Sequence, residues 1–139
     1  MFKTLLATIQ PIVQLTKNSN FKVIDMINPE AFALVQDENT SAETLDELSN
    51  DENPFIRVRV AAHMNTSAET LVKLSNDETP LVKQFVAEHL NTPVDILIEL
   101  SKDSDMSYWV AGNPNTPVEL LNKFSKNEYF LIIEGLRAN

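Results

Sequence analysis

The feature that most constrains this chain is a short phrase that recurs at nearly constant spacing. Asn-Thr-[Ser/Pro]-x-[Glu/Asp] occurs four times, with steps of 26, 26 and 24 residues, beginning at Asn39, Asn65, Asn91 and Asn115. A fixed period of this length is typical of repeat proteins, in which each repeat is one supersecondary unit. We therefore predict that most of the chain is one unit copied about four times.

Each copy of the phrase has the pattern of a capping box. In such a box the Thr hydroxyl accepts from the backbone N–H three residues later, and the carboxylate of that later residue accepts from the N–H of the Thr. Pro93 and Pro117, which follow Thr, are expected as first helical residues, where a missing N–H costs nothing. The pattern predicts four helix starts, at the pairs Thr40 and Glu43, Thr66 and Glu69, Thr92 and Asp95, and Thr116 and Glu119.

Two short apolar segments follow each predicted start. In the first, two apolar residues three apart precede a Ser and a polar turn: Leu45 and Leu48, Leu71 and Leu74, Leu97 and Leu100, Leu121 and Phe124. The second has an i, i+4 pair, which indicates one face of a helix: Ile56 and Val60, Val82 and Val86, Met106 and Val110, Ile132 and Leu136. Two extra residues in the first two copies predict longer loops, between Asp51 and Ile56 and between Asp77 and Val82.

Helices this short are not stable alone in water, so we expect the copies to stack. The sequence predicts an all-α fold, an α-solenoid of short helix pairs with about four repeats of 24–26 residues. We expect one folding unit. Its parts are an N-terminal helical cap with a degenerate half-repeat at residues 1–38, and repeats at 39–64, 65–90, 91–114 and 115–139.

The best-formed copy resembles the leucine-rich repeat variant family. The segment from Val110 to Leu121 reads VAGNPNTPVELL and is similar to the family motif. Weaker forms precede the other copies, at Ile56-Arg57 with Val60-Ala61, Val82-Lys83 with Val86-Ala87, and Ile132-Ile133 with Leu136-Arg137. The resemblance covers residues 39–139 and implies alternating α- and 3₁₀-helices wound into a right-handed superhelix. The founding member's iron–sulfur cluster needs a Cys-rich segment; this chain has no Cys, so we expect no cofactor.

When the four copies are aligned with one another, each aligned position forms a column. The columns in which the copies carry different residues are the expected partner-binding positions. The residues just before the Val-Ala position include Arg59, Phe85 and the adjacent Tyr108 and Trp109. Aromatic side chains dominate binding hot spots, so Tyr108 and Trp109 are candidate anchors. The alternative is that Trp109, the only Trp, fills a gap in the core.

His63 and His89 occupy equivalent positions, which raises the question of a metal site. Asn113 and Asn139 hold the same position in the other copies, so the column favours a polar turn residue that bonds the backbone. Two imidazoles without a third ligand would also make a poor zinc site. We predict structural histidines and no metal.

The acidic residues are concentrated in the repeats. Residues 28–139 carry 19 acidic and 8 basic side chains, a net charge of −11, whereas residues 1–27 carry three Lys and one Asp, a net charge of +2. Such a field repels nucleic-acid phosphates and favours basic protein surfaces. Acids beyond the caps and turns are expected to form an acidic ridge; the alternative is a merely solvated face. The candidates are Asp46, Glu47, Glu52, Glu78, Glu99 and Asp105.

Motifs for catalysis are missing from the sequence. Two Gly residues cannot build a Gly-rich phosphate loop, no Cys can act as a nucleophile, and no H-E-x-x-H spacing occurs. We expect a non-enzymatic adaptor or scaffold that binds another protein. The alternatives are an acidic inhibitor that imitates nucleic acid and a small hydrolase-like enzyme built from dispersed residues.

The two ends carry predictions of their own. The N-terminus has no small-x-small cleavage site, so we read it as an amphipathic cap and expect a cytoplasmic protein. No stretch approaches the roughly 20 apolar residues that cross a bilayer, so no membrane partner is expected. The last copy is unusually apolar near Tyr129 and Phe130. Either it forms a homodimer or these two residues fold back over the exposed face.

Overall fold

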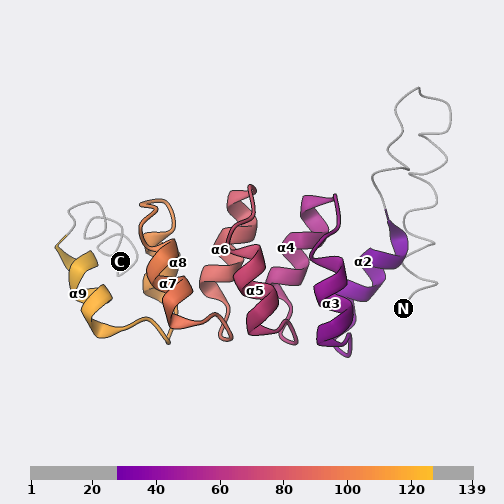
Figure 1. Cartoon of the computed structure of the whole chain (residues 1–139), viewed down its shortest axis with the longest axis horizontal. Coiled ribbons are helices and arrows are strands. Elements are labelled where there is room, and N and C mark those ends of the chain that lie inside the picture. Colours follow the sequence, from indigo (N-terminus) through magenta and orange to yellow (C-terminus); the bar gives the residue numbers. More distant parts are fainter. Residues whose placement is uncertain (1–27, 127–139) are drawn as a thin grey trace, which may run out of the picture. The chain divides into compact units, whose positions relative to one another are not determined.

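The computed structural model describes residues 28–126 (Figure 1). Every regular element within that range is an α-helix and none is a strand, which confirms the all-α prediction. The predictions for the N-terminal cap before Asn28, for Tyr129 and Phe130, and for the pair Ile132 and Leu136 lie outside the described residues.

The described residues fall into two compact units, and the boundary lies between Thr66 and Ser67. The first unit contains α2 (Pro29–Gln36), α3 (Ala42–Leu48) and α4 (Pro54–Ala62). The second contains α5 (Ala68–Leu74), α6 (Pro80–Glu88), α7 (Val94–Leu100), α8 (Ser107–Gly112) and α9 (Val118–Ser125). That the chain folds as one cooperative unit stays a prediction.

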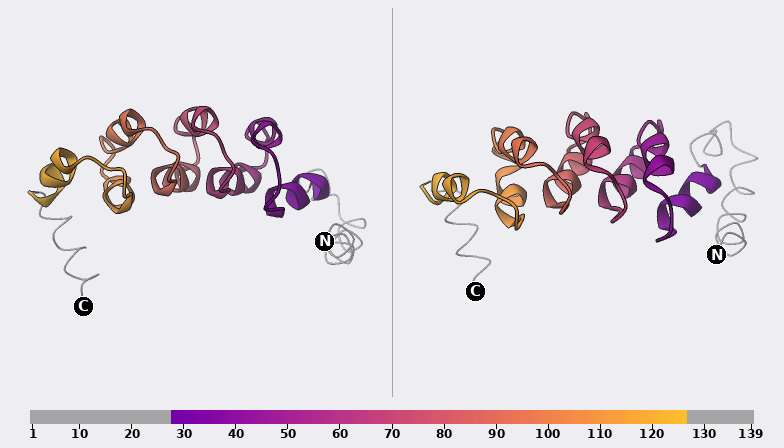
Figure 2. Two further views of the ribbon diagram at one scale, coloured as in Figure 1. Left: turned by 90° about the horizontal axis from the view of Figure 1, so that it is seen from below. Right: turned by 60° about the horizontal axis from the view of Figure 1, so that its bottom comes forward.

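Neighbouring helices cover each other within each unit. In the first, α4 packs against both α2 and α3. In the second, α6 packs beside α8, α5 packs on α6, α7 contacts both α6 and α8, and α9 packs on α8. Figure 2 shows α6 and α8 in one layer of this unit and α5 and α7 in the other. Each short helix thus receives from its neighbours the apolar wall that it lacks alone.

The predicted apolar pairs form the core. In the second segments the described pairs are buried, namely Ile56 and Val60, Val82 and Val86, and Met106 and Val110. In the first segments Leu45, Leu71, Leu74, Leu97, Leu100 and Phe124 are buried. Leu48 and Leu121 are half-buried. Each fully buried Leu, Ile or Val contributes roughly 1.5–3 kcal/mol relative to an exposed one.

The two extra residues of the first two copies lengthen a helix rather than a loop. Pro54 and Pro80 open the nine-residue α4 and α6, whereas α8, in the shorter third copy, has six residues. Proline is favoured at this position because its fixed φ suits the helix and its missing N–H is not needed. Asn53 also caps α4, since its side chain accepts from the N–H of Phe55 at 2.9 Å. The prediction of longer loops is therefore wrong.

The second helix of each pair is also not 3₁₀. Among residues 28–126, α4, α6 and α8 are all α-helices, contrary to the alternation that the family resemblance implied. Helices of nine residues are too long for 3₁₀ geometry, which is uncommon beyond three or four residues.

The helices of the recurring phrase begin one residue later than predicted. Ser41 and Ser67 are the N-caps of α3 and α5, and their hydroxyls accept from the N–H of Thr44 and Thr70, each at 3.2 Å. Pro93 and Pro117 are the N-caps of α7 and α9, without a side-chain cap bond. These prolines thus precede the helix instead of opening it.

The threonines of the phrase bond the preceding helix instead of capping the next one. Thr40, Thr66 and Thr92 donate from their hydroxyls to Leu34 O, Val60 O and Val86 O at 2.6 Å, and Thr116 donates to Val110 O. Each acceptor lies in the last turn of a helix, where carbonyls lack helical partners. All four threonines are buried.

The capping-box carboxylates are consequently not paired with the threonine backbone. The N–H of Thr40 donates to Asp37 O at 3.1 Å, and those of Thr66, Thr92 and Thr116 donate to the equivalent carbonyls. The acids remain exposed in the first helical turn, where they interact favourably with the helix dipole. They are Glu43, Glu69, Asp95 and Glu119.

Candidate functional site

The C-caps of α2, α4, α6 and α8 share one turn chemistry. Asp37 and Asn113 accept through Oδ1 from the N–H two residues later, each at 2.9 Å. His63 and His89 accept through Nδ1 in the same way, at 3.1 and 2.9 Å. The imidazole Nδ1 and the carboxyl or amide Oδ1 therefore serve the same role. The prediction that both histidines are structural turn residues is confirmed.

The side chains of His63 and Asn113 also bond the end of a helix one copy earlier. His63 bonds Asp37 O through Nε2 at 2.8 Å, and Asn113 donates to Ala87 O at 2.7 Å and His89 O at 3.0 Å. Since Nδ1 of His63 accepts from an N–H, Nε2 carries the proton and donates. Both ring nitrogens of His63 are thus used by the backbone. No group of three His, Asp or Glu side chains within residues 28–126 could hold a metal ion.

Tyr108 and Trp109 form a pair at the surface of α8. Their rings meet edge to face, with centroids 4.9 Å apart and planes at 84°. Both side chains are half-buried. Trp109 therefore presents part of its indole ring to the surface, and the interpretation that it fills a gap in the core stays a prediction.

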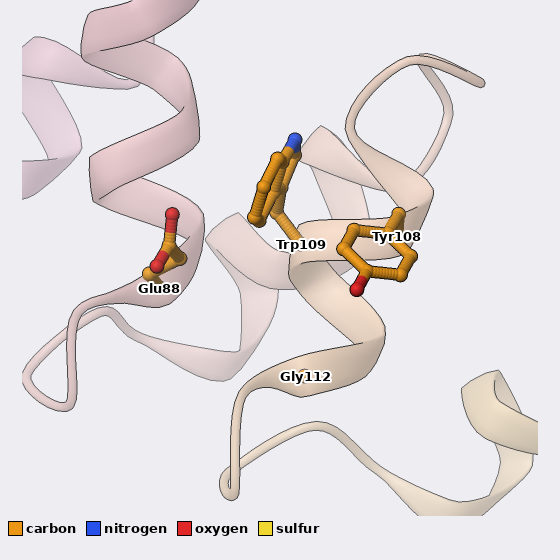
Figure 3. Close-up of a pocket in the computed structure, with 4 residues that line it drawn as sticks. All are labelled: Glu88, Tyr108, Trp109 and Gly112. Carbon is orange, nitrogen blue, oxygen red and sulfur yellow. The ribbon is translucent and has the colours of Figure 1, made fainter. Parts of the chain in front are cut away.

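The pair lines a hollow of about 180 Å³ together with Glu88 and Gly112 (Figure 3). Glu88 is the last residue of α6 and Gly112 the last of α8. In Figure 3 the indole ring of Trp109 extends from α8 toward the end of α6 that carries Glu88. The Glu88 side chain is exposed, and its Oε1 accepts from Gln84 Nε2 at 3.0 Å. A Cβ atom added to Gly112 would meet nothing within 4 Å.

Sequence reasoning missed Glu88 and Gly112, although a signal for both existed. They occupy the same column, directly after the Val-Ala position, and Ala62 and Ala138 hold that column in the other copies. The copies carry three different residue types in this column and four in the one that contains Trp109, so the same comparison of copies would have found it.

Two other members of the predicted aromatic column do not line this hollow. Phe85 lies on α6 and is half-buried, whereas Arg59 lies on α4, in the first unit, and is exposed. The structure thus brings together Tyr108 and Trp109 but not the whole column.

The six acids of the predicted ridge are all exposed and are divided between the two units. Asp46 and Glu47 on α3 and Glu52 before α4 belong to the first. Glu78 before α6, Glu99 on α7 and Asp105 before α8 belong to the second, where Glu99 pairs with Lys102 at 2.6 Å. A continuous ridge would join both units and stays a prediction.

The neighbouring acids Asp51, Asp77 and Asp103 hold the polar turns instead. Their Oδ1 atoms accept from the N–H groups of Asn53, Thr79 and Asp105 at 2.8, 2.9 and 3.0 Å. Such Asx turns are typical of Asp before a helix start. These three acids thus stabilise the polar turns between the helices.

The size of the hollow limits its chemistry. Small-molecule sites usually have about 300–1,000 Å³, so the hollow beside Trp109 suits one side-chain head group better than a substrate. Within residues 28–126 no helix is long and apolar enough to span a bilayer. Comparison of the chain with protein-family models, with curated proteins and with solved structures found no match.

Proposed function

We propose that the chain is a non-enzymatic protein-interaction module whose partner carries a basic surface. The observation that carries this proposal is the Tyr108–Trp109 pair, partly exposed on a helix beside the carboxylate of Glu88. Aromatic residues in such positions are the usual anchors of protein interfaces, because they offer a large contact area at modest entropic cost.

The proposed scaffold is a right-handed α-solenoid of about four repeats that resembles the leucine-rich repeat variant family. The recurrence of one turn chemistry supports this proposal, since Asp37, His63, His89 and Asn113 make the same bond at steps of 26, 26 and 24 residues. In solenoids of this kind, neighbouring units stabilise each other and leave long surfaces for partners.

The charge of the chain supports a basic partner. Residues 28–126 carry 17 acidic and 7 basic side chains, a net charge of −10. A negative field speeds the encounter with a basic protein and disfavours DNA or RNA. We propose that the six exposed ridge acids and the aromatic pair together bind this partner.

The test compares capture from a native lysate by the wild-type chain and by two variants of equal charge. The first variant neutralises ridge acids: Glu47→Gln, Glu52→Gln, Glu78→Gln and Asp105→Asn. The control neutralises four first-turn acids: Glu43→Gln, Glu69→Gln, Asp95→Asn and Glu119→Gln. Because the net charge changes equally, any difference in capture between the variants shows that the position of the acids matters, and not only their number.

We expect a protein that the wild type and the control capture, that the first variant loses, and that rising salt releases. Capture that both variants retain equally at high salt would contradict an acidic docking surface. Displacement of the captured protein by double-stranded DNA would identify the chain as an imitator of nucleic acid.

A further inference from the structure

Three of the four residues that line the hollow between α6 and α8, Tyr108, Trp109 and Glu88, carry groups that attract positive charge. The faces of Trp and Tyr rings carry the negative part of a quadrupole and bind cations. The rings of Tyr108 and Trp109 meet edge to face at 84°, and both residues line the hollow. Glu88 adds a full negative charge at the end of α6. The lining therefore selects a cation over a neutral or acidic group.

The fourth lining residue, Gly112, has no side chain that could fill the hollow. A Cβ atom there would meet nothing within 4 Å, so the glycine is not needed for packing at this point. The volume of about 180 Å³ is below the roughly 300–1,000 Å³ of small-molecule sites. That is room for the head group of one side chain.

The chemistry of the lining favours a guanidinium over an ammonium group. A guanidinium is planar and weakly hydrated, stacks on aromatic faces, and donates two parallel N–H bonds to a carboxylate. Gln84 Nε2 donates to Oε1 of Glu88 at 3.0 Å, which orients the carboxylate. We infer that this hollow receives an arginine side chain of the protein partner. The inference rests on the proposed function and names the group that the site recognises.

The direct test is a titration of the full chain with N-acetyl-arginine methylamide at constant ionic strength. Trp109 is the only Trp, so fluorescence excited selectively in Trp reports this site alone. We expect a saturable change in its fluorescence. The citrulline derivative has the same shape without the charge and should bind roughly 2- to 30-fold more weakly, the range of a cation–π contact. The lysine derivative should bind more weakly than the arginine derivative.

Two variants keep the fluorescent reporter and change the site. Glu88→Gln removes the charge without changing the shape, and Glu69→Gln is its control, an exposed acid of the same unit that is not among the ridge acids. Gly112→Leu fills the hollow, and Asn122→Leu, at an exposed position of α9 outside the hollow, is its control. We expect Glu88→Gln and Gly112→Leu to weaken arginine binding at least about threefold, and both controls to leave it unchanged. Circular dichroism would check that all four variants are folded.

Equal binding of the arginine and citrulline derivatives would overturn the inference, as would tighter binding of the lysine derivative. Equal effects of Glu88→Gln and Glu69→Gln would overturn it as well. The proposed function can fail separately. If arginine binds but no protein is captured, the interaction module is wrong and the arginine site stands. If a protein is captured equally by the wild type, Glu88→Gln and Gly112→Leu, the module stands and the arginine site is wrong.

Discussion

Asn65 donates from its side-chain amide to Glu38 O at 2.8 Å and so joins two turns that lie 27 residues apart in the sequence. The same amide donates to Thr40 O at 3.0 Å. Asn115 makes the equivalent bond to Leu90 O at 2.8 Å. The first residue of the recurring phrase thus connects one turn to the turn before it, while the Thr beside it bonds the preceding helix.

The Asn65 bonds give the first prediction. Asn65→Asp should lower the free energy of unfolding by about 1–3 kcal/mol, because a carboxylate cannot donate to the two carbonyls and each bond contributes about 0.5–1.5 kcal/mol. The measurement is urea unfolding. Asn50→Asp is the control, since Asn50 bonds only within its own turn, to Asp46 O at 3.3 Å. Equal losses in both variants would show that the bond between turns contributes nothing.

The role of the threonines gives the second prediction. Thr66→Val keeps the shape of a fully buried side chain but removes its bond to Val60 O, so we expect a loss of about 0.5–1.5 kcal/mol. Glu69→Ala should cost less than about 0.5 kcal/mol, as for most surface substitutions. Thermal unfolding of both variants checks this order. A larger loss in Glu69→Ala would indicate that the Glu69 carboxylate caps the helix, as the capping-box pattern predicts.

The turn chemistry gives the third prediction. Asn113→His should change the free energy of unfolding by less than about 1 kcal/mol, because His63 makes bonds of the same kind. Asn113→Asp should cost about 3 kcal/mol or more, since it places an unpaired carboxylate against Ala87 O and His89 O at a buried position. Guanidinium unfolding measures both. Similar stability of the two variants would mean that the donated bonds are dispensable.

Gly112 gives the fourth prediction. It lies in the last turn of α8, has no positive φ, and has open space at its Cβ position. Gly112→Ala should therefore raise the free energy of unfolding by about 0.4–1 kcal/mol, because alanine loses less chain entropy on folding. A calorimetric scan should show a higher melting temperature. A lower melting temperature would mean that α8 needs the backbone flexibility of glycine at this position.

Sequence patterns located the core but misplaced the bonds at the helix starts. The apolar pairs, such as Val82 and Val86, were predicted correctly because helical periodicity is a local property. The phrase, however, allows two cap residues one position apart, Thr66 or Ser67. The Thr hydroxyl bonds the last turn of α4 once the turn between the helices has formed, and only Ser67 is then available as the cap.

The candidate site was predicted only in part for a similar reason. Tyr108 and Trp109 stood out because the copies differ at their column, yet the hollow also needs Glu88 from another helix. Glu88 lies beside Trp109 only because α6, which carries Glu88, packs against α8, which carries Trp109. No pattern within one copy contains that relationship.

The sequence by itself determined the short α-helices, the apolar face of each and the polar turns between them, because those interactions join residues a few positions apart. Only the tertiary structure decided that Asn65 reaches Glu38, that the threonines bond the preceding helices, and that Glu88 lies beside Trp109. The link from Asn65 and the hollow join segments from different copies. They form only when packing brings one helix pair against the next.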